Sequence, residues 1–95
     1  MSALYLSRFY GLIRMDHRIT TAHISLFMAL YERWSAKGYE GPVEFRRQEL
    51  MESAKISGLA TFHRCIRDLA QFGYIRYLPS YNPAVRSQAF ILMRQ

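Results

Sequence analysis

Apolar residues recur with a helical period along most of the chain before Gly73. The first such pattern predicts a helix over residues 3–14, with one apolar stripe at the spacing i, i+3, i+4, i+7: Leu6, Phe9, Tyr10 and Ile13. Because Gly11 lowers the helix propensity by about 1 kcal/mol and short helices are marginal alone, this helix needs tertiary packing. Its stripe must either dock on its own domain or pair with a second copy of the chain.

A longer apolar pattern predicts the central helix of the core. Thr20 or Thr21 can accept the first helical N–H groups as an N-cap, and Gly38 is a natural stop after Lys37. Between these ends the apolar residues recur at helical spacing: Ile24, Phe27, Met28, Tyr31 and Trp34. We expect this stripe to form the backbone of the core.

A turn, a short strand and a short helix are predicted next. The run "GYEGPVEF" has two glycines and a proline, which predict a turn before an extended stretch around Val43 to Phe45. Residues 46–54 read as a short helix with Leu50 and Met51 facing inward. Lys55 and Ile56 then form a tight connection to the following helix.

The next helix is expected over residues 57–72, with Ser57 as its cap and Gly73 as its end. Its apolar face is predicted to be buried and consists of Leu59, Phe62, Ile66 and Leu69. Its opposite face is predicted to be exposed and consists of Ala60, Arg64, Arg67 and Gln71. The helix is therefore expected to present basic side chains to its surroundings.

Two strand-like runs, "YIRYLPS" over residues 74–80 and "SQAFILM" over residues 87–93, follow this helix. They are separated by "YNPAVR", whose Asn-Pro pair is a turn signal, so a protruding loop is expected there. The predicted fold class is α+β, mostly α with a small antiparallel β-hairpin.

The run "FRRQELMESAKISGLATFHRCIRDLAQFGYIRYLPS" carries the clearest resemblance to a known fold. Its short helix, tight turn, arginine-bearing helix and direct passage into a strand resemble the winged helix-turn-helix family. The matching positions at the helix end and strand start are Leu69, Gly73, Tyr74 and Ile75. More loosely, the chain is similar to small winged-helix proteins and replication-initiation domains of bacterial mobile elements and phages.

The resemblance implies a winged helix-turn-helix with an extra N-terminal helix. It divides the chain into residues 1–18, an N-terminal helix and possible dimerisation arm, and residues 19–95, the winged domain. It also implies a recognition helix over residues 57–72, which would lie in the major groove of DNA. The wing over residues 79–87 would contact the backbone or the minor groove.

The charge distribution is compatible with this expectation. The chain has 13 Lys and Arg against 7 Asp and Glu, a formal net charge of +6 and a pI near 9.9. From Arg46 onward there are 8 basic and 3 acidic side chains, a net +5, whereas residues 1–45 carry only +1. A basic surface of this kind either serves solubility or binds a polyanion.

Candidate DNA-binding residues follow from the predicted elements. Arg64 is expected to contact a base edge, with Thr61, His63 and Arg67 on base edges or flanking phosphates, and Ser57 is small enough for close approach. Arg46, Arg47 and Lys55 are expected on the sugar-phosphate backbone, and Arg86 in the loop with Tyr81 and Asn82 alongside. The expected function is sequence-specific binding of double-stranded DNA by a transcriptional regulator, acting as a homodimer through Leu6, Phe9, Tyr10 and Ile13.

An alternative from another class is a winged-helix protein-interaction or replication-initiation module of a mobile element. An enzyme is not expected, because the acidic residues form no paired-carboxylate arrangement and no Ser-His-Asp or Gly-rich phosphate motif is present. Cys65 is the only cysteine and lacks partners with metal-ligand spacing, so we expect a buried hydrophobe in a cytoplasmic protein. No cofactor, metal, membrane or small-molecule substrate is expected.

Overall fold

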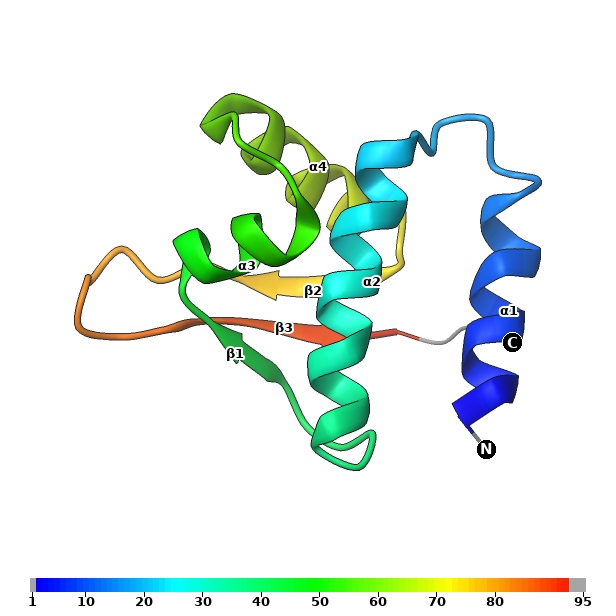
Figure 1. The fold of residues 1–95 in the computed structure, drawn as a ribbon, viewed down its shortest axis with the longest axis horizontal. Helices are drawn as coiled ribbons and strands as arrows, with labels where there is room; N and C mark the ends of the chain where they lie inside the picture. Colours follow the sequence, from blue (N-terminus) through cyan, green and yellow to red (C-terminus); the bar gives the residue numbers. More distant parts are fainter. Residues whose placement is uncertain (1, 93–95) are drawn as a thin grey trace.

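Four helices and three short strands make up residues 2–92, the part of the chain that the computed structural model describes (Figure 1). The elements are α1 (Ser2–Ile13), α2 (Thr21–Ala36), β1 (Val43–Phe45), α3 (Arg47–Ala54), α4 (Leu59–Gln71), β2 (Ile75–Leu78) and β3 (Ser87–Ile91). The expected α+β class is confirmed. Residues 93–95, which end the predicted second domain and the last strand-like run, lie outside the described residues.

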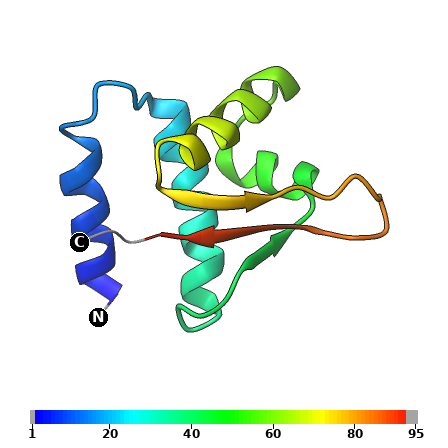
Figure 2. The ribbon, with the colours of Figure 1, turned by 180° about the vertical axis from the view of Figure 1, so that it is seen from behind.

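The strands form one antiparallel sheet in the order β1-β3-β2 (Figure 2). The predicted hairpin is present, with Ile75 opposite Ile91 across β2 and β3. On its other edge β3 pairs with β1, where Val43 lies opposite Ala89. The sheet therefore has three strands, and the pairing of β1 is an addition that the sequence pattern did not predict.

Helix α2 is the centre of the fold, with α1 on one side and the sheet, α3 and α4 on the other (Figure 1). Its residues Leu26, Phe27 and Leu30 are fully buried. Of the two predicted N-caps, Thr20 is the one found, and the helix begins at Thr21. None of the helices within residues 2–92 has both the length and the apolar character that crossing a membrane requires.

Helix α1 docks on its own domain through part of its stripe. Phe9 is 2% exposed and stacks on Phe27 with ring centroids 3.6 Å apart, and Ile13 is also buried. These two residues therefore offer little surface to a second copy while α1 is docked in this way. Of the predicted dimer stripe, only Leu6 and Tyr10 remain accessible.

The expected bounds and burial of the helix over residues 57–72 need two corrections. Helix α4 begins at Leu59, and its N-cap is Gly58 and not Ser57, which lies in the preceding turn. Leu59 is 45% exposed and not part of the core. Because Leu59 is in the first turn of α4, its side chain covers the surface toward the helix start and lines a shallow groove beside α3 that includes Met51.

Candidate nucleic-acid interface

A tight turn, residues 55–58, joins α3 to α4. Lys55 adopts the left-handed conformation, with φ 61° and ψ 36°, and its N–H donates to the carbonyl of Glu52 at 3.2 Å. The N–H of Ile56 donates to the carbonyl of Met51 at 3.0 Å, which completes a Schellman motif. Buried Ile56 anchors the turn, so the Lys55 side chain is held exposed at the corner between the two helices.

Helix α4 has one buried and one exposed face, as the sequence predicted from Phe62 onward. Phe62, Ile66 and Leu69 are fully buried, whereas Arg64 and Arg67 are exposed. The Nε–H of Arg67 donates to the carbonyl of His63 at 3.3 Å, so this guanidinium is folded back along its own helix. The predicted outward orientation of both arginines is confirmed.

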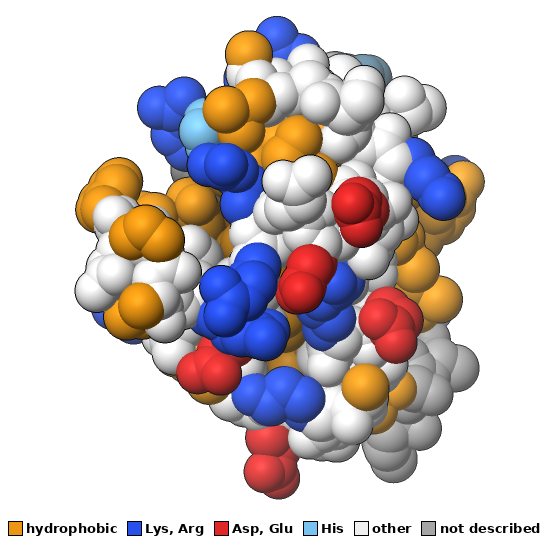
Figure 3. All heavy atoms as spheres, turned by 60° about the vertical axis from the view of Figure 1, so that its left-hand side comes forward, with side chains coloured by type: hydrophobic (Ala, Val, Ile, Leu, Met, Phe, Trp, Pro, Cys, Tyr) orange, Lys and Arg blue, Asp and Glu red, His pale blue; other side chains and the backbone are white. Residues whose placement is uncertain are grey.

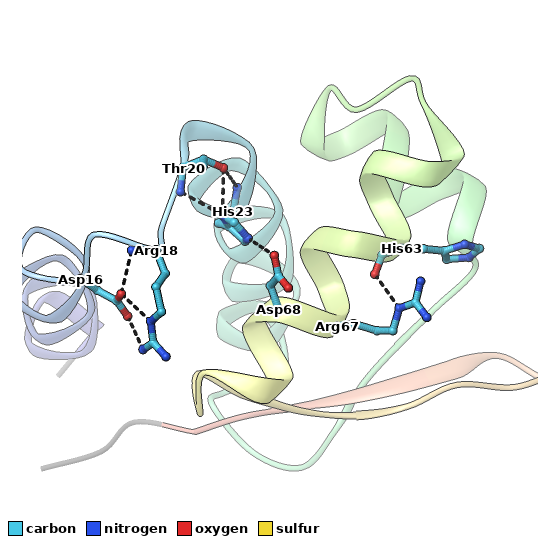
Figure 4. A network of polar contacts seen from close by, with 7 residues as sticks. All are labelled: Asp16, Arg18, Thr20, His23, His63, Arg67 and Asp68. Carbon is cyan, nitrogen blue, oxygen red and sulfur yellow. Dashed lines mark hydrogen bonds and ion pairs between the residues drawn. The ribbon is translucent and has the colours of Figure 1, made fainter.

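Buried polar contacts lock α4 against the start of α2. His23 is 4% exposed; its Nδ1 accepts the Thr20 N–H at 2.9 Å, and its Nε2 lies 2.9 Å from Oδ2 of Asp68. Because Nδ1 accepts a backbone N–H, we assign the ring proton to Nε2, which donates it to the carboxylate. Figure 4 shows Asp68 pointing toward α2 while His63 and Arg67 point to the other side of α4.

This contact is one that the sequence analysis missed. The two partners are 45 positions apart in the sequence, so neither indicates the other. The Thr20 hydroxyl also accepts the His23 N–H at 3.4 Å, so His23 takes the place that Glu or Gln has in a capping box. A His three positions after a Thr N-cap was the only local signal available.

The predicted cationic residues come from the start of α3, the 55–58 turn, α4 and the loop between β2 and β3. These residues, which we call the basic face, are Arg46, Arg47, Lys55, Arg64, Arg67 and Arg86, and all are exposed. Figure 3 shows Lys and Arg side chains gathered on this side of the molecule, with a few acidic side chains between them. Within residues 2–92, no ion pair engages Arg47, Lys55 or Arg64, so their charges are available to a partner.

A hydroxyl-lined groove of about 390 Å³ borders the basic face where the start of α2 meets the 55–58 turn. Its lining includes Ser57 and Thr61, two predicted DNA-binding residues, together with Thr21 and Ser25. Ser25 already donates its hydroxyl to the carbonyl of Ala54. The groove therefore places small and hydroxyl-bearing side chains beside the exposed cation of Lys55.

The loop over residues 79–86 uses its polar side chains to hold its own shape. The Oδ1 of Asn82 accepts the N–H of Ala84 at 3.0 Å, and the Ser87 hydroxyl accepts the N–H of Ser80 at 3.0 Å. Arg86 lies 3.9 Å from Glu49 of α3, and both side chains are about half exposed. Of the three candidates in this loop, Asn82 thus stabilises the turn through its side chain, Arg86 lies close to α3, and Tyr81 is exposed.

Cys65 lies on α4 and is buried. Burial raises the pKa of the Cys65 thiol, which packs as a small hydrophobe, as predicted. Among residues 2–92, no three His, Cys, Asp or Glu side chains are grouped so that they can hold a metal ion. Comparisons with protein-family models, curated proteins and solved structures find no match to this chain.

Proposed function

We propose that this chain is a winged helix-turn-helix protein that binds double-stranded DNA in a sequence-specific manner and regulates transcription. The observation that carries the proposal is the two-sided helix α4. One side is buried and fixed to α2 through His23 and Asp68, and the other presents Arg64 and Arg67. We place this activity in the cytoplasm, the compartment that suits a chain with one unpaired thiol, Cys65.

Helix α4 is the element that reads the bases. The major groove of B-DNA is about 12 Å wide and admits one helix, and an arginine can donate two hydrogen bonds to the O6 and N7 atoms of guanine. Arg64 points away from the core without an intramolecular ion partner within residues 2–92, so it takes this role. Thr61, His63 and Arg67 lie on neighbouring turns of the same helix, where they contact flanking bases or phosphates.

The remaining cations position the protein on the phosphates. Arg46 and Arg47 lie at the start of α3, Lys55 at the corner of the turn, and Arg86 at the base of the wing. With Arg67, they provide five phosphate contacts. Five contacts correspond to a slope of about −4.5 in log K against log salt, or an affinity loss of about 500-fold between about 50 and 200 mM salt.

A salt titration of duplex binding tests this proposal. Arg47→Ala should make the slope shallower by about 0.9, because one phosphate contact is lost, and should leave the sequence preference unchanged. Arg14→Ala is the matched control, since Arg14 is an exposed arginine that follows α1, remote from the basic face. An intact protein that binds no duplex at about 50 mM salt contradicts the proposal.

We propose that the protein binds DNA as a homodimer, because one domain of this size buries little surface on DNA. A single DNA-binding module of this size buries only about 600–1,000 Å² on DNA, so two half-sites increase the affinity and the specificity. The accessible stripe residues Leu6 and Tyr10 line an apolar groove of about 490 Å³ between α1 and α2, together with Ile24 and Met28. We assign the second copy of the chain to this groove.

The alternative is a protein-interaction or replication-initiation module of the same fold. The same apolar groove between α1 and α2 favours it, because exposed Tyr10 and Met28 are suited to an apolar partner surface. The salt titration separates the two functions, since a module of this class needs no affinity for duplex DNA.

A further inference from the structure

The tip of the loop between β2 and β3 is apolar. Tyr81 is 92% exposed and Val85 is 57% exposed, and Pro83 and Ala84 between them are also exposed. Arg86, at the end of the loop, is its only charged residue. The loop projects away from the body of the molecule (Figure 1), so these side chains contribute little to the stability of the fold.

Hydrogen bonds hold this tip in a defined conformation. The Ser80 hydroxyl donates to the carbonyl of Asn82 at 3.1 Å, and the N–H of Val85 donates to the same carbonyl at 2.9 Å. The Asn82 side chain accepts the N–H of Ala84, as described above. Because these polar groups are used inside the loop, the tip offers a partner chiefly an aromatic ring and aliphatic surface.

Cations lie behind the apolar tip. Arg46 donates from Nη1 to the carbonyl of Pro83 at 3.4 Å, which ties the loop to the start of α3. A groove of about 470 Å³ between the loop and α3 is lined by Arg46, Arg47 and Tyr81. The arrangement is an apolar projection with arginines at its base, beside the cations of the basic face (Figure 3).

We propose that this tip is an apolar wedge that enters the minor groove of DNA, where Tyr81 and Val85 partly unstack one base step and bend the duplex. A phosphate attracts the arginines at the base of the loop, but an aromatic or aliphatic side chain gains only by leaving water against sugars and base faces. The minor groove offers both surfaces, with phosphates along its rim and stacked bases at its floor. The proposal rests on the DNA-binding function proposed above.

The wedge also implies a preference among target sequences. Pyrimidine–purine steps such as TA and CA unstack more easily than other steps. A duplex with such a step under the wing should therefore bind more tightly than one with a stiff step at the same place. The wing would then contribute sequence preference without hydrogen bonds to bases.

Fluorescence on a labelled duplex tests the wedge. The duplex is one selected by the intact protein from a random pool, with 2-aminopurine at a TA step under the wing and a donor–acceptor dye pair at its ends. Intact protein should raise the 2-aminopurine emission and the energy transfer between the ends. Tyr81→Ala should abolish both changes and weaken binding by roughly 5- to 150-fold, the loss that one aromatic–base contact corresponds to.

Two variants serve as controls. Met15→Ala removes another exposed apolar side chain, 72% exposed in the turn after α1, and should leave both signals unchanged. Tyr81→Phe keeps the ring and should retain both signals. Because Tyr81 is almost fully solvated, its variants should keep the thermal midpoint of the intact protein.

The outcomes separate the wedge from the underlying function. If the intact protein binds no duplex at about 50 mM salt, the DNA-binding function fails and the wedge fails with it. If Tyr81→Ala binds and bends the duplex as the intact protein does, the wedge alone is overturned. The wedge is also overturned if Tyr81→Ala keeps its affinity for the duplex and loses affinity only for single-stranded DNA or only for a protein partner.

Discussion

Lys55 connects the stability of the fold to its proposed function. It is a non-glycine residue in the left-handed conformation, at φ 61° and ψ 36°, in the position of a Schellman motif that glycine usually occupies. Its exposed side chain is also one of the proposed phosphate contacts. Replacing Lys55 by glycine should therefore raise the stability and weaken DNA binding.

The size of the stability change follows from the backbone. The left-handed conformation costs a residue with a Cβ atom about 1–2 kcal/mol, and glycine avoids this cost but loses more entropy on folding. Lys55→Gly should therefore stabilise the protein by about 1 kcal/mol, which raises the thermal midpoint of a domain of this size by roughly 4–8 °C. Loss of one cation should make the salt slope of duplex binding shallower by about 0.9.

Thermal unfolding followed by circular dichroism and a salt titration of duplex binding measure the two effects. Lys55→Gln is the matched variant, because it loses the charge but keeps the Cβ atom, so its salt slope should match that of Lys55→Gly without the gain in midpoint. A Lys55→Gly midpoint no higher than that of Lys55→Gln refutes the backbone argument. If both variants bind the duplex with the same salt slope as the intact protein, Lys55 does not contact a phosphate.

Three further predictions concern α1 and the residues around it. Hydrogen bonds from Arg18 hold the pKa of Asp16 well below its usual range, so the ionised carboxylate stabilises the folded state. This stabilisation is complete at neutral pH and is lost as the pH falls through the folded-state pKa of Asp16. Asp16→Asn should thus lower the thermal midpoint at pH 7, and the difference in midpoint from the intact protein should become smaller below about pH 4. A difference that does not change with pH contradicts the stabilising role of ionised Asp16. Phe9→Ala should lower the free energy of unfolding in urea by about 3–5 kcal/mol, because it removes the ring stacked on Phe27, and a loss below about 1 kcal/mol would mean that α1 is not docked. Tyr10→Ser should keep the fold but halve the mass in light scattering, and an unchanged dimer mass excludes the α1–α2 groove as the dimer interface.

Local signals explain which parts of the fold the sequence predicts well. Helix α2 was placed within a residue at each end because its N-cap, Thr20, and its apolar period lie in the helix itself. Leu59 continued the apolar period of α4 but is exposed, since burial depends on whether another element covers that turn. The apolar period of a sequence thus predicts which face of a helix is buried, but not at which residue the packing against other elements ends.

Long-range contacts explain what the sequence analysis missed. The pairing of β1 with β3 joins Val43 to Ala89, and nothing in either run indicates the other as its partner. The contact between His23 and Asp68 spans 45 positions and fixes the orientation of α4. The basic candidates could be named from charge and helical phase, whereas the apolar tip around Tyr81 required knowledge of which side chains remain exposed.

Selection of bound duplexes from a random DNA pool tests the central claim, that α4 reads base edges through Arg64, most directly. At about 50 mM salt the intact protein and Arg14→Ala should enrich the same motif. Arg64→Ala should still bind but lose the preference at one base pair, a loss of about 1–3 kcal/mol in discrimination at that position. No enriched motif with the intact protein, or an unchanged motif with Arg64→Ala, would contradict the claim.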